Sequence, residues 1–239
     1  MSLAIFHLFA AAINTYVIWY DQTYVELPLE NELLKTLPLK SRSMFLTIWC
    51  LIIQTVYHTI AFLNDVFGST AASPRSRPLI RSIRDTLFSL AFPIALYVST
   101  AFWAIYAVDK DLIFPDHIEK LYPTWVNHVM HTTVSVFMFV ELLLASRNYP
   151  SRKIGVSIIT AFNLAYMSWF LTIYFNTGAW VYPVFEPLNW PMRVVFLILS
   201  HSTVVGFYLI GEKLNYLANP NTKAYTNGTV TEASPKKKR

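Results

Sequence analysis

The strongest constraint on this chain is a series of apolar stretches, each long enough to cross a lipid bilayer. About 20 apolar residues in a helix, rising ~1.5 Å per residue, cover the ~30 Å hydrocarbon layer. Six such stretches cover about residues 3–20, 44–63, 86–107, 124–145, 154–175 and 192–210. Only 14% of the 239 residues are charged, whereas a soluble domain has about 25%. We therefore predict an all-α, polytopic membrane protein with six transmembrane helices.

The distribution of charge predicts the orientation of these helices. Lysines and arginines gather in the loops after the second and fourth stretches and in the C-terminal tail, whereas most acidic residues lie in the other loops. Positively charged loops stay on the cytosolic side of a membrane. We therefore expect both termini in the cytosol, and we read the net charge of +5 as a sign of orientation rather than of nucleic-acid binding. The basic loops contain Arg75, Arg77, Arg81, Arg84, Arg147, Arg152 and Lys153.

The end of the chain differs in composition from the rest. We expect residues 1–214 to form the transmembrane domain and residues 215–239 to form a disordered, basic cytosolic tail, because the tail is polar. Residues 236–239 are three lysines and an arginine, which match the dilysine signal that returns proteins to the endoplasmic reticulum. An equal alternative is a basic tail that touches anionic lipid. The expected location is the endoplasmic reticulum, the plasma membrane or both.

The fourth apolar stretch carries polar residues that a helix surrounded by lipid would avoid. Asn127, His128 and His131 lie in its first third. Polar side chains within a membrane span usually face the protein interior, a partner or a water-filled cavity. Asn127 and His131 are four residues apart and therefore share one helical face. The simplest interpretation is hydrogen bonding to neighbouring helices, and the alternative is a site with chemical function.

Thr47 in the second stretch is a candidate partner for His131. Under the predicted topology both stretches enter the membrane from the non-cytosolic side, which places Thr47 roughly 5 Å deep and His131 roughly 10 Å deep. A hydroxyl becomes a nucleophile when a nearby imidazole accepts its proton. Asn127, His128 or a backbone carbonyl would have to orient the imidazole, because no carboxylate is evident in this leaflet. The competing interpretation is that Thr47 bonds to its own helical turn, as membrane threonines often do.

The sequence favours neither a metal nor a cofactor. His128 and His131 are three apart and could share a metal ion, but the six histidines are spread over both leaflets and the loops. The single cysteine, Cys50, lies within an apolar stretch and is expected to be a small buried residue. Glu141 and Asp65 fall at the cytosolic helix ends, where we expect pairing with loop arginines. We predict no bound metal and no cofactor.

Seven segments together resemble a known family. The chain is similar to the androgen-induced and androgen-dependent TFPI-regulating protein family of six-span membrane proteins, over about three quarters of its length. The matching segments are MFLTIWCLIIQTVY (44–57), RDTLFSLAFP (84–93), FWAIYAVDKDLIFP (102–115), WVNHVMHT (125–132), YPSRK (149–153), TGAWVYPVF (177–185) and GEKLN (211–215).

The resemblance implies an integral-membrane hydrolase of fatty acid esters of hydroxy fatty acids. It implies that Thr47 is the nucleophile and His131 the base, that an acyl-enzyme forms, and that the lipid substrate enters laterally from the bilayer. We expect Asn127 or His128 to orient His131 or to donate a hydrogen bond to the oxyanion.

Two other functions fit the same residues. A membrane lipid acyltransferase would also use polar residues in apolar helices but would transfer the acyl group to an acceptor other than water. A non-enzymatic transporter or scaffold would use them to line a pathway. Release of a free fatty acid and a hydroxy acid would favour hydrolysis over both alternatives.

Overall fold

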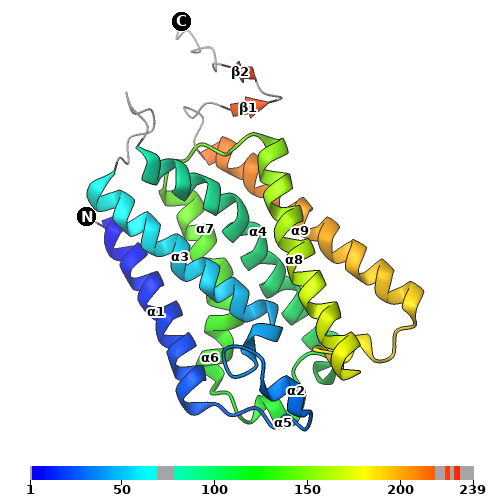
Figure 1. Cartoon of the computed structure of the whole chain (residues 1–239). Helices are drawn as coiled ribbons and strands as arrows, with labels where there is room; N and C mark the ends of the chain where they lie inside the picture. The colour runs from blue at the N-terminus through cyan, green and yellow to red at the C-terminus, as the bar shows by residue number, and fades with distance from the viewer. Residues whose placement is uncertain (1, 69–77, 219–223, 227–228, 232–239) are drawn as a thin grey trace, which may run out of the picture.

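In the computed structural model of this protein, six long helices form one bundle (Figure 1). The structure describes residues 2–68, 78–218, 224–226 and 229–231. The long helices are α1 (Ser2–Tyr24), α3 (Leu46–Phe67), α4 (Leu79–Val108), a composite helix of α6 (Thr124–His128), η3 (Val129–Thr133) and α7 (Val134–Leu144), α8 (Arg152–Thr177) and α9 (Trp190–Ala218).

Short elements fill the connections between the long helices. They are α2 (Glu32–Lys35), η1 (Arg42–Met44), η2 (Lys110–Leu112), α5 (Asp116–Glu119) and η4 (Pro183–Phe185). All five lie at one end of the bundle, which we call the loop end; the opposite end, where α1 begins and α9 ends, is the terminal end (Figure 1). Beyond α9, β1 (Ala224–Thr226) and β2 (Thr229–Thr231) pair as a short antiparallel hairpin.

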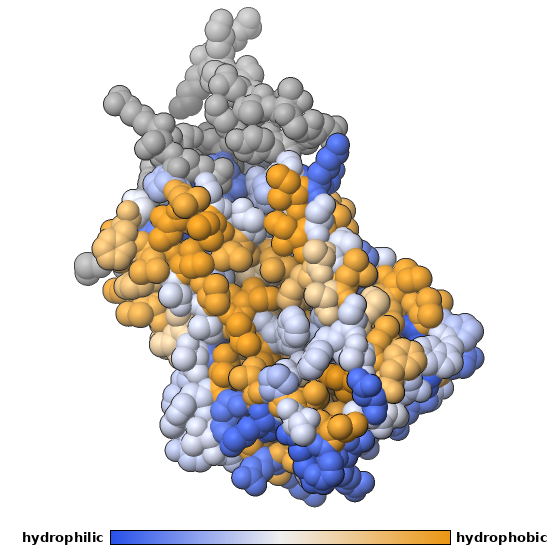
Figure 2. Space-filling view, viewed as in Figure 1, coloured by the Kyte–Doolittle hydropathy of each residue, from blue (hydrophilic) through white to orange (hydrophobic). Residues whose placement is uncertain are grey.

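The predicted all-α, six-helix architecture is confirmed. Within the described residues, six helices are long and apolar enough to span a bilayer. Apolar side chains cover much of the bundle's visible face, and hydrophilic ones gather at its lower edge over the loop end (Figure 2). Five of the six helices are longer than the apolar stretches predicted for them, because residues at their ends continue the hydrogen-bond ladder; the composite helix over residues 124–144 is not longer. The chain is a multi-pass integral membrane protein.

Two predictions on the chain's end and orientation remain predictions. Helix α1 begins and helix α9 ends at the same end of the bundle, as an even number of crossings requires (Figure 1). Helix α9 continues to Ala218, four residues beyond the expected end of the transmembrane domain. Of the tail expected to be disordered, residues 219–223, 227–228 and 232–239, including the dilysine signal, lie outside the described residues.

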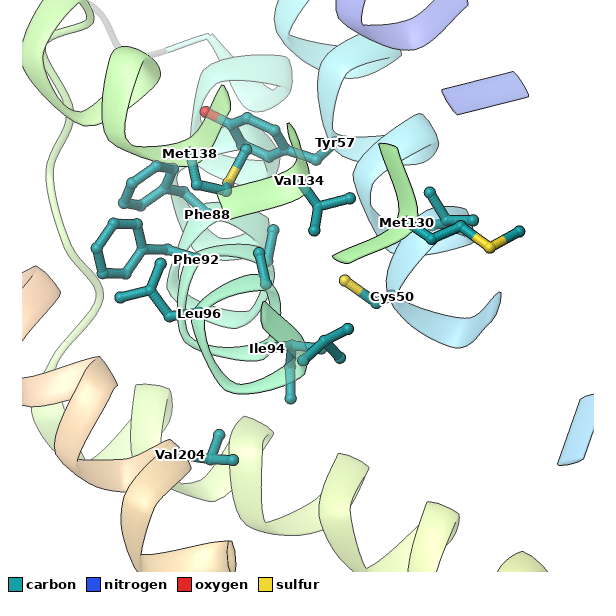
Figure 3. Packing of buried hydrophobic residues seen from close by; sticks show 14 of the residues in the cluster. Cys50, Tyr57, Phe88, Phe92, Ile94, Leu96, Met130, Val134, Met138 and Val204 are labelled. Carbon is teal, nitrogen blue, oxygen red and sulfur yellow. The ribbon is translucent and has the colours of Figure 1, made fainter. Parts of the chain in front are cut away.

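Helix α4 lies at the centre of the bundle and packs against α3, α7, α8 and α9. Its buried face carries Phe88 and Phe92, whose rings stack with centroids 5.4 Å apart. Figure 3 shows residues of this apolar cluster gathered around α4, with Cys50 of α3 among them. Cys50 is fully buried, as expected. The core thus holds α3 in a fixed position against the fourth membrane helix, which carries His131.

Part of the charge at the terminal end is buried within helices instead of exposed in loops. Arg81 and Arg84 were expected in the loop after the second span, but both lie in the first turns of α4 and are buried. Arg84 pairs with Asp85 at 2.7 Å and donates to the carbonyl of Ser146 at 2.6 Å. These bonds satisfy the guanidinium next to the core and join α4 to the connection that follows α7.

A second buried network joins three helices near the terminal end. Glu141 of α7 accepts hydrogen bonds from Tyr57 of α3 at 2.5 Å and from Arg147 at 3.1 Å, and its second oxygen lies 2.6 Å from Nε2 of His7 in α1. Nδ1 of His7 lies 2.8 Å from Asp65 of α3. The expected pairing of Glu141 with a loop arginine is confirmed by Arg147. The contact of His7 with both carboxylates was not predictable from the pattern of apolar residues in the sequence.

Candidate active site

Thr47 lies in the first turn of α3, and its hydroxyl is not bonded to its own helix. The carbonyl four residues earlier belongs to Ser43, and this carbonyl accepts the indole N–H groups of Trp49 and Trp169 at 2.8 and 2.9 Å. By contrast, the hydroxyls of Thr15, Thr59, Thr100, Thr177 and Thr203 each donate to the carbonyl four residues earlier. The two indoles therefore leave the Thr47 hydroxyl available for another partner.

Two tyrosines fix the start of α3. Tyr166 of α8 donates its hydroxyl proton to the carbonyl of Met44 at 2.9 Å, and Tyr182 accepts from the N–H of Leu46 at 2.9 Å. The two hydroxyls are 3.0 Å apart. Because the proton of Tyr166 is used on Met44, Tyr182 is the donor between them. Burial raises the pKa of Tyr182 to about 12, so this hydroxyl keeps its proton at neutral pH. The backbone just before Thr47 is thus held from α8 and from the connection after α8.

His131 lies on a single π-helical turn, η3, within the fourth membrane helix. Such turns disturb the regular ladder of backbone hydrogen bonds and occur frequently at functional sites. Trp103 of α4 donates its indole N–H to the carbonyl of His131 and to the hydroxyl of Thr132, both at 3.1 Å. Phe102 of α4 stacks on the imidazole, with centroids 3.6 Å apart and an interplanar angle of 8°. These contacts fix both the backbone and the ring plane of His131.

Asn127 determines which imidazole nitrogen carries the proton. Nδ1 of His131 lies 2.6 Å from the side-chain oxygen of Asn127 and 3.1 Å from its backbone carbonyl. A backbone carbonyl can only accept a hydrogen bond, so Nδ1 is the protonated nitrogen. The unprotonated Nε2 then accepts a proton from whatever lies on the other side of the ring.

The group on that side is Thr47. Its Oγ1 lies 3.2 Å from Nε2 of His131, although 84 positions separate the two residues in the chain. With Nδ1 protonated, the threonine hydroxyl is the donor and the imidazole the acceptor. This is the geometry in which a histidine removes the proton of an attacking hydroxyl.

His128 does not join this arrangement. Its side chain is exposed, stacks on Trp103 with centroids 5.5 Å apart, and lies 3.3 Å from the hydroxyl of Thr132. The other residue considered for orientation, Asn127, lies on the inner face beside the imidazole. Among the described residues, no group of three or more histidine, cysteine, aspartate or glutamate side chains is arranged to hold a metal ion.

A cavity of about 350 Å³ lies next to the Thr47–His131 pair. Its wall is mostly apolar and aromatic and comes from α3, α4, α6, η3, α8 and α9 and from the connections at the loop end. This volume is within the range of pockets that bind small molecules and acyl chains. Thr47, Asn127 and His131 all line the cavity. A hydrophobic substrate in this space would therefore meet the hydroxyl directly.

A buried ion pair anchors the connection between α1 and α3 over the cavity. Nε of Arg42 lies 3.0 Å from Asp21, and its Nη2 donates to the carbonyl of Val25 at 2.5 Å. Tyr122 donates to the same aspartate at 2.7 Å, and burial raises its pKa well above the usual range. Leu39, Lys40 and Ser41, just before Arg42, all have positive φ angles, a conformation that side chains adopt only where their surroundings hold it. Arg42 thereby holds the connection in place next to Thr47.

Comparison with known proteins identifies the family. Residues 2–216 match the family model described as FAR-17a/AIG1-like protein. Androgen-dependent TFPI-regulating protein from Mus musculus is 37% identical over 188 residues, 76% of this chain and 81% of that protein. The protein of the same name from Homo sapiens is 37% identical over 177 residues, 74% of this chain and 76% of its own length. Androgen-induced gene 1 protein from Homo sapiens is 36% identical over 179 residues, 72% of this chain and 75% of its own length.

The chain belongs to the FAR-17a/AIG1-like family. The resemblance predicted from the seven segments is therefore confirmed. The FAR-17a/AIG1-like match extends from the start of α1 to residue 216 in α9 and includes every residue of the site described above. No solved structure matches the chain.

Several residues around the site were missed at the level of sequence. Phe102 and Trp103 lie in the segment FWAIYAVDKDLIFP, and Tyr182 lies in TGAWVYPVF. Both segments contributed to the resemblance to the family, but the sequence predicted no role for these three residues. Asn163 of α8 and His201 of α9 also line the cavity. Membrane helices are apolar on every face, so the sequence pattern does not show which aromatic residues face the site.

Proposed function

We propose that this chain is an integral-membrane hydrolase of fatty acid esters of hydroxy fatty acids, with Thr47 as nucleophile and His131 as general base. The observation that carries the proposal is the 3.2 Å contact between Thr47 Oγ1 and His131 Nε2 in the wall of an apolar cavity. A lipid ester is the substrate class that fits both an apolar cavity and an activated hydroxyl.

The first half of the reaction forms an acyl-enzyme. Thr47 Oγ1 attacks the ester carbonyl carbon while Nε2 of His131 takes the hydroxyl proton. The bond from the carbonyl carbon to the alkoxy oxygen then breaks. The departing hydroxy fatty acid takes the proton back from the imidazolium, and the fatty acyl group remains on Thr47. Asn127 keeps Nδ1 protonated throughout and so keeps Nε2 directed at the reacting oxygen.

The second half returns the enzyme to its starting state. Water attacks the acyl carbonyl carbon, and Nε2 of His131 accepts one of its protons. The bond to Thr47 Oγ1 breaks, Oγ1 regains the proton from His131, and the free fatty acid leaves. In the same proposal, both termini are cytosolic, the site opens toward the luminal or extracellular side, the lipid enters from the bilayer, and the protein resides in the endoplasmic reticulum, the plasma membrane or both.

Product analysis tests this function against the two alternatives. The full chain, purified into lipid nanodiscs, is incubated with a fatty acid ester of a hydroxy fatty acid, and the products are measured by mass spectrometry. We expect equal amounts of free fatty acid and hydroxy fatty acid. Transfer of the acyl group to a second lipid would identify an acyltransferase, and an unchanged ester would favour a transporter or scaffold.

The role of Asn127 gives a second prediction. We expect Asn127→Ala to lower kcat about tenfold, because one of two acceptors that hold the Nδ1 proton is lost while the backbone carbonyl remains. Asn127→Asp, which keeps an acceptor oxygen, should retain more activity. His128→Ala serves as the matched variant on the outward face and should stay within about twofold of wild type in kcat. A larger loss from His128→Ala than from Asn127→Ala would contradict the assigned orientation.

A further inference from the structure

The cavity contains a second polar pair that the proposed reaction does not use. Nδ2 of Asn163 in α8 lies 2.9 Å from Nδ1 of His201 in α9. Both side chains line the cavity and both are only partly buried. Helices α8 and α9 lie on the opposite side of the bundle from α1 and α3 (Figure 1). The pair is therefore carried by different helices from those that carry Thr47 and His131.

The position of this pair along the cavity follows from Tyr166. Tyr166 bonds to the carbonyl of Met44, three residues before Thr47. Asn163 precedes Tyr166 by three residues and shares its helical face, roughly one turn further from the loop end. The cavity thus has two polar positions, the nucleophile near the loop end and the amide–imidazole pair about one turn deeper, with an apolar wall around them.

The hydrogen bonds already made by the pair determine what it can bind. The amide N–H of Asn163 donates to Nδ1 of His201, so the imidazole proton lies on Nε2. Among the described residues, neither side chain forms another hydrogen bond. Nε2–H of His201 remains as a donor and the side-chain oxygen of Asn163 as an acceptor. One donor and one acceptor match a neutral carboxyl group, whose carbonyl oxygen accepts and whose hydroxyl donates.

Other groups near the cavity fit this role less well. Arg42 is the cationic side chain of the cavity wall, but its Nε pairs with Asp21 and its other nitrogens donate to the carbonyls of Lys40 and Val25. The hydroxyl of Ser200, beside His201, donates to the carbonyl of Phe196. A neutral carboxyl group also costs less to place in an apolar cavity than a carboxylate.

We propose that Asn163 and His201 bind the free carboxyl group of the substrate, in its protonated form, while the ester lies against Thr47. This inference rests on the proposed hydrolase function and adds a basis for substrate selection. A lipid with two oxygen-bearing groups, an ester and a carboxyl, would occupy both polar positions. An ester that lacks the carboxyl group would occupy only the first.

The test compares two esters with the same fatty acyl group. One is an ester of a hydroxy fatty acid, and the other is an ester of the corresponding secondary alkanol, with a methyl group in place of the carboxyl. Release of the fatty acid is measured with the full chain in nanodiscs. We expect wild type to prefer the carboxyl-bearing ester about fivefold to tenfold in kcat/KM, the effect of one or two hydrogen bonds between neutral groups.

Variants of His201 decide whether the pair causes this preference. His201→Leu should abolish the preference by raising KM for the carboxyl-bearing ester alone, whereas His201→Gln, whose amide can donate from a similar position, should partly restore it. Ser202→Ala, on the adjacent exposed position, is the matched control and should leave the preference unchanged.

Three results would separate the possible failures. Equal loss on both esters in His201→Leu would overturn the inference and indicate that the pair only joins α8 to α9. A wild type that hydrolyses both esters without preference would overturn it as well. A wild type that hydrolyses neither ester would instead contradict the proposed hydrolase function.

Discussion

Thr47→Ala is expected to reduce hydrolysis by about 10³-fold or more, because it removes the oxygen that attacks the ester. His131→Ala should cause a loss of similar size, since the hydroxyl then lacks its base. The double variant should be no worse than either single variant, because residues that act as one unit show strongly non-additive effects. The measurement is kcat with purified protein in nanodiscs.

Thr47→Ser distinguishes a nucleophile from a packing residue. Serine keeps the hydroxyl and removes a methyl group, so activity should be retained. A transporter or scaffold would respond to Thr47→Ser and Thr47→Ala alike. Independent, multiplicative losses from Thr47→Ala and His131→Ala would contradict the proposal that the two residues act together.

Glu141→Gln is expected to lower the free energy of unfolding by about 3–5 kcal/mol, the usual cost of removing one partner from a buried ion pair. Glu141 is fully buried and contacts His7, Tyr57 and Arg147, which come from α1, from α3 and from the connection after α7. A neutral amide would leave the buried guanidinium of Arg147 without its counter-charge. Thermal or denaturant unfolding in detergent micelles measures the change.

Glu212→Gln is the matched control for this prediction. Glu212 pairs with Arg152 at 2.7 Å, but the arginine side chain is 57% exposed. An exposed pair contributes at most about 1 kcal/mol, because water and salt screen it. If the two variants lowered stability equally, the buried network would not be an ionic one.

The six helices were predictable from sequence because length and hydropathy are local properties. Their approximate depths also predicted that Thr47 and His131 lie at similar levels, and the two side chains are in contact. Their rotation about the helix axes was not predictable, since lipid-facing and core-facing positions are both apolar. The occupied carbonyl of Ser43, the π-helical turn under His131 and the stacking of Phe102 are tertiary features with no local pattern.

For the buried charges as well, the sequence indicated local properties but not tertiary packing. Arg81 and Arg84 looked like loop residues that report orientation, yet they are enclosed by the start of α4 and the segment after α7. The sequence indicated the end of the bundle on which they lie but not their burial, because burial depends on which helices meet there. The Asn163–His201 contact likewise depends on how α8 packs against α9.

The proposed reaction requires the hydroxyl of Thr47 to become acylated, and covalent labelling shows whether this hydroxyl is a nucleophile. The full chain in nanodiscs is treated with a long-chain alkyl fluorophosphonate, and the modified residue is identified by mass spectrometry. We predict a stoichiometric adduct on Thr47 in wild type and none in Thr47→Ala or His131→Ala. A wild-type protein that hydrolyses the ester while carrying no adduct on Thr47, or carrying it on another residue, would contradict the assignment of Thr47 as the nucleophile.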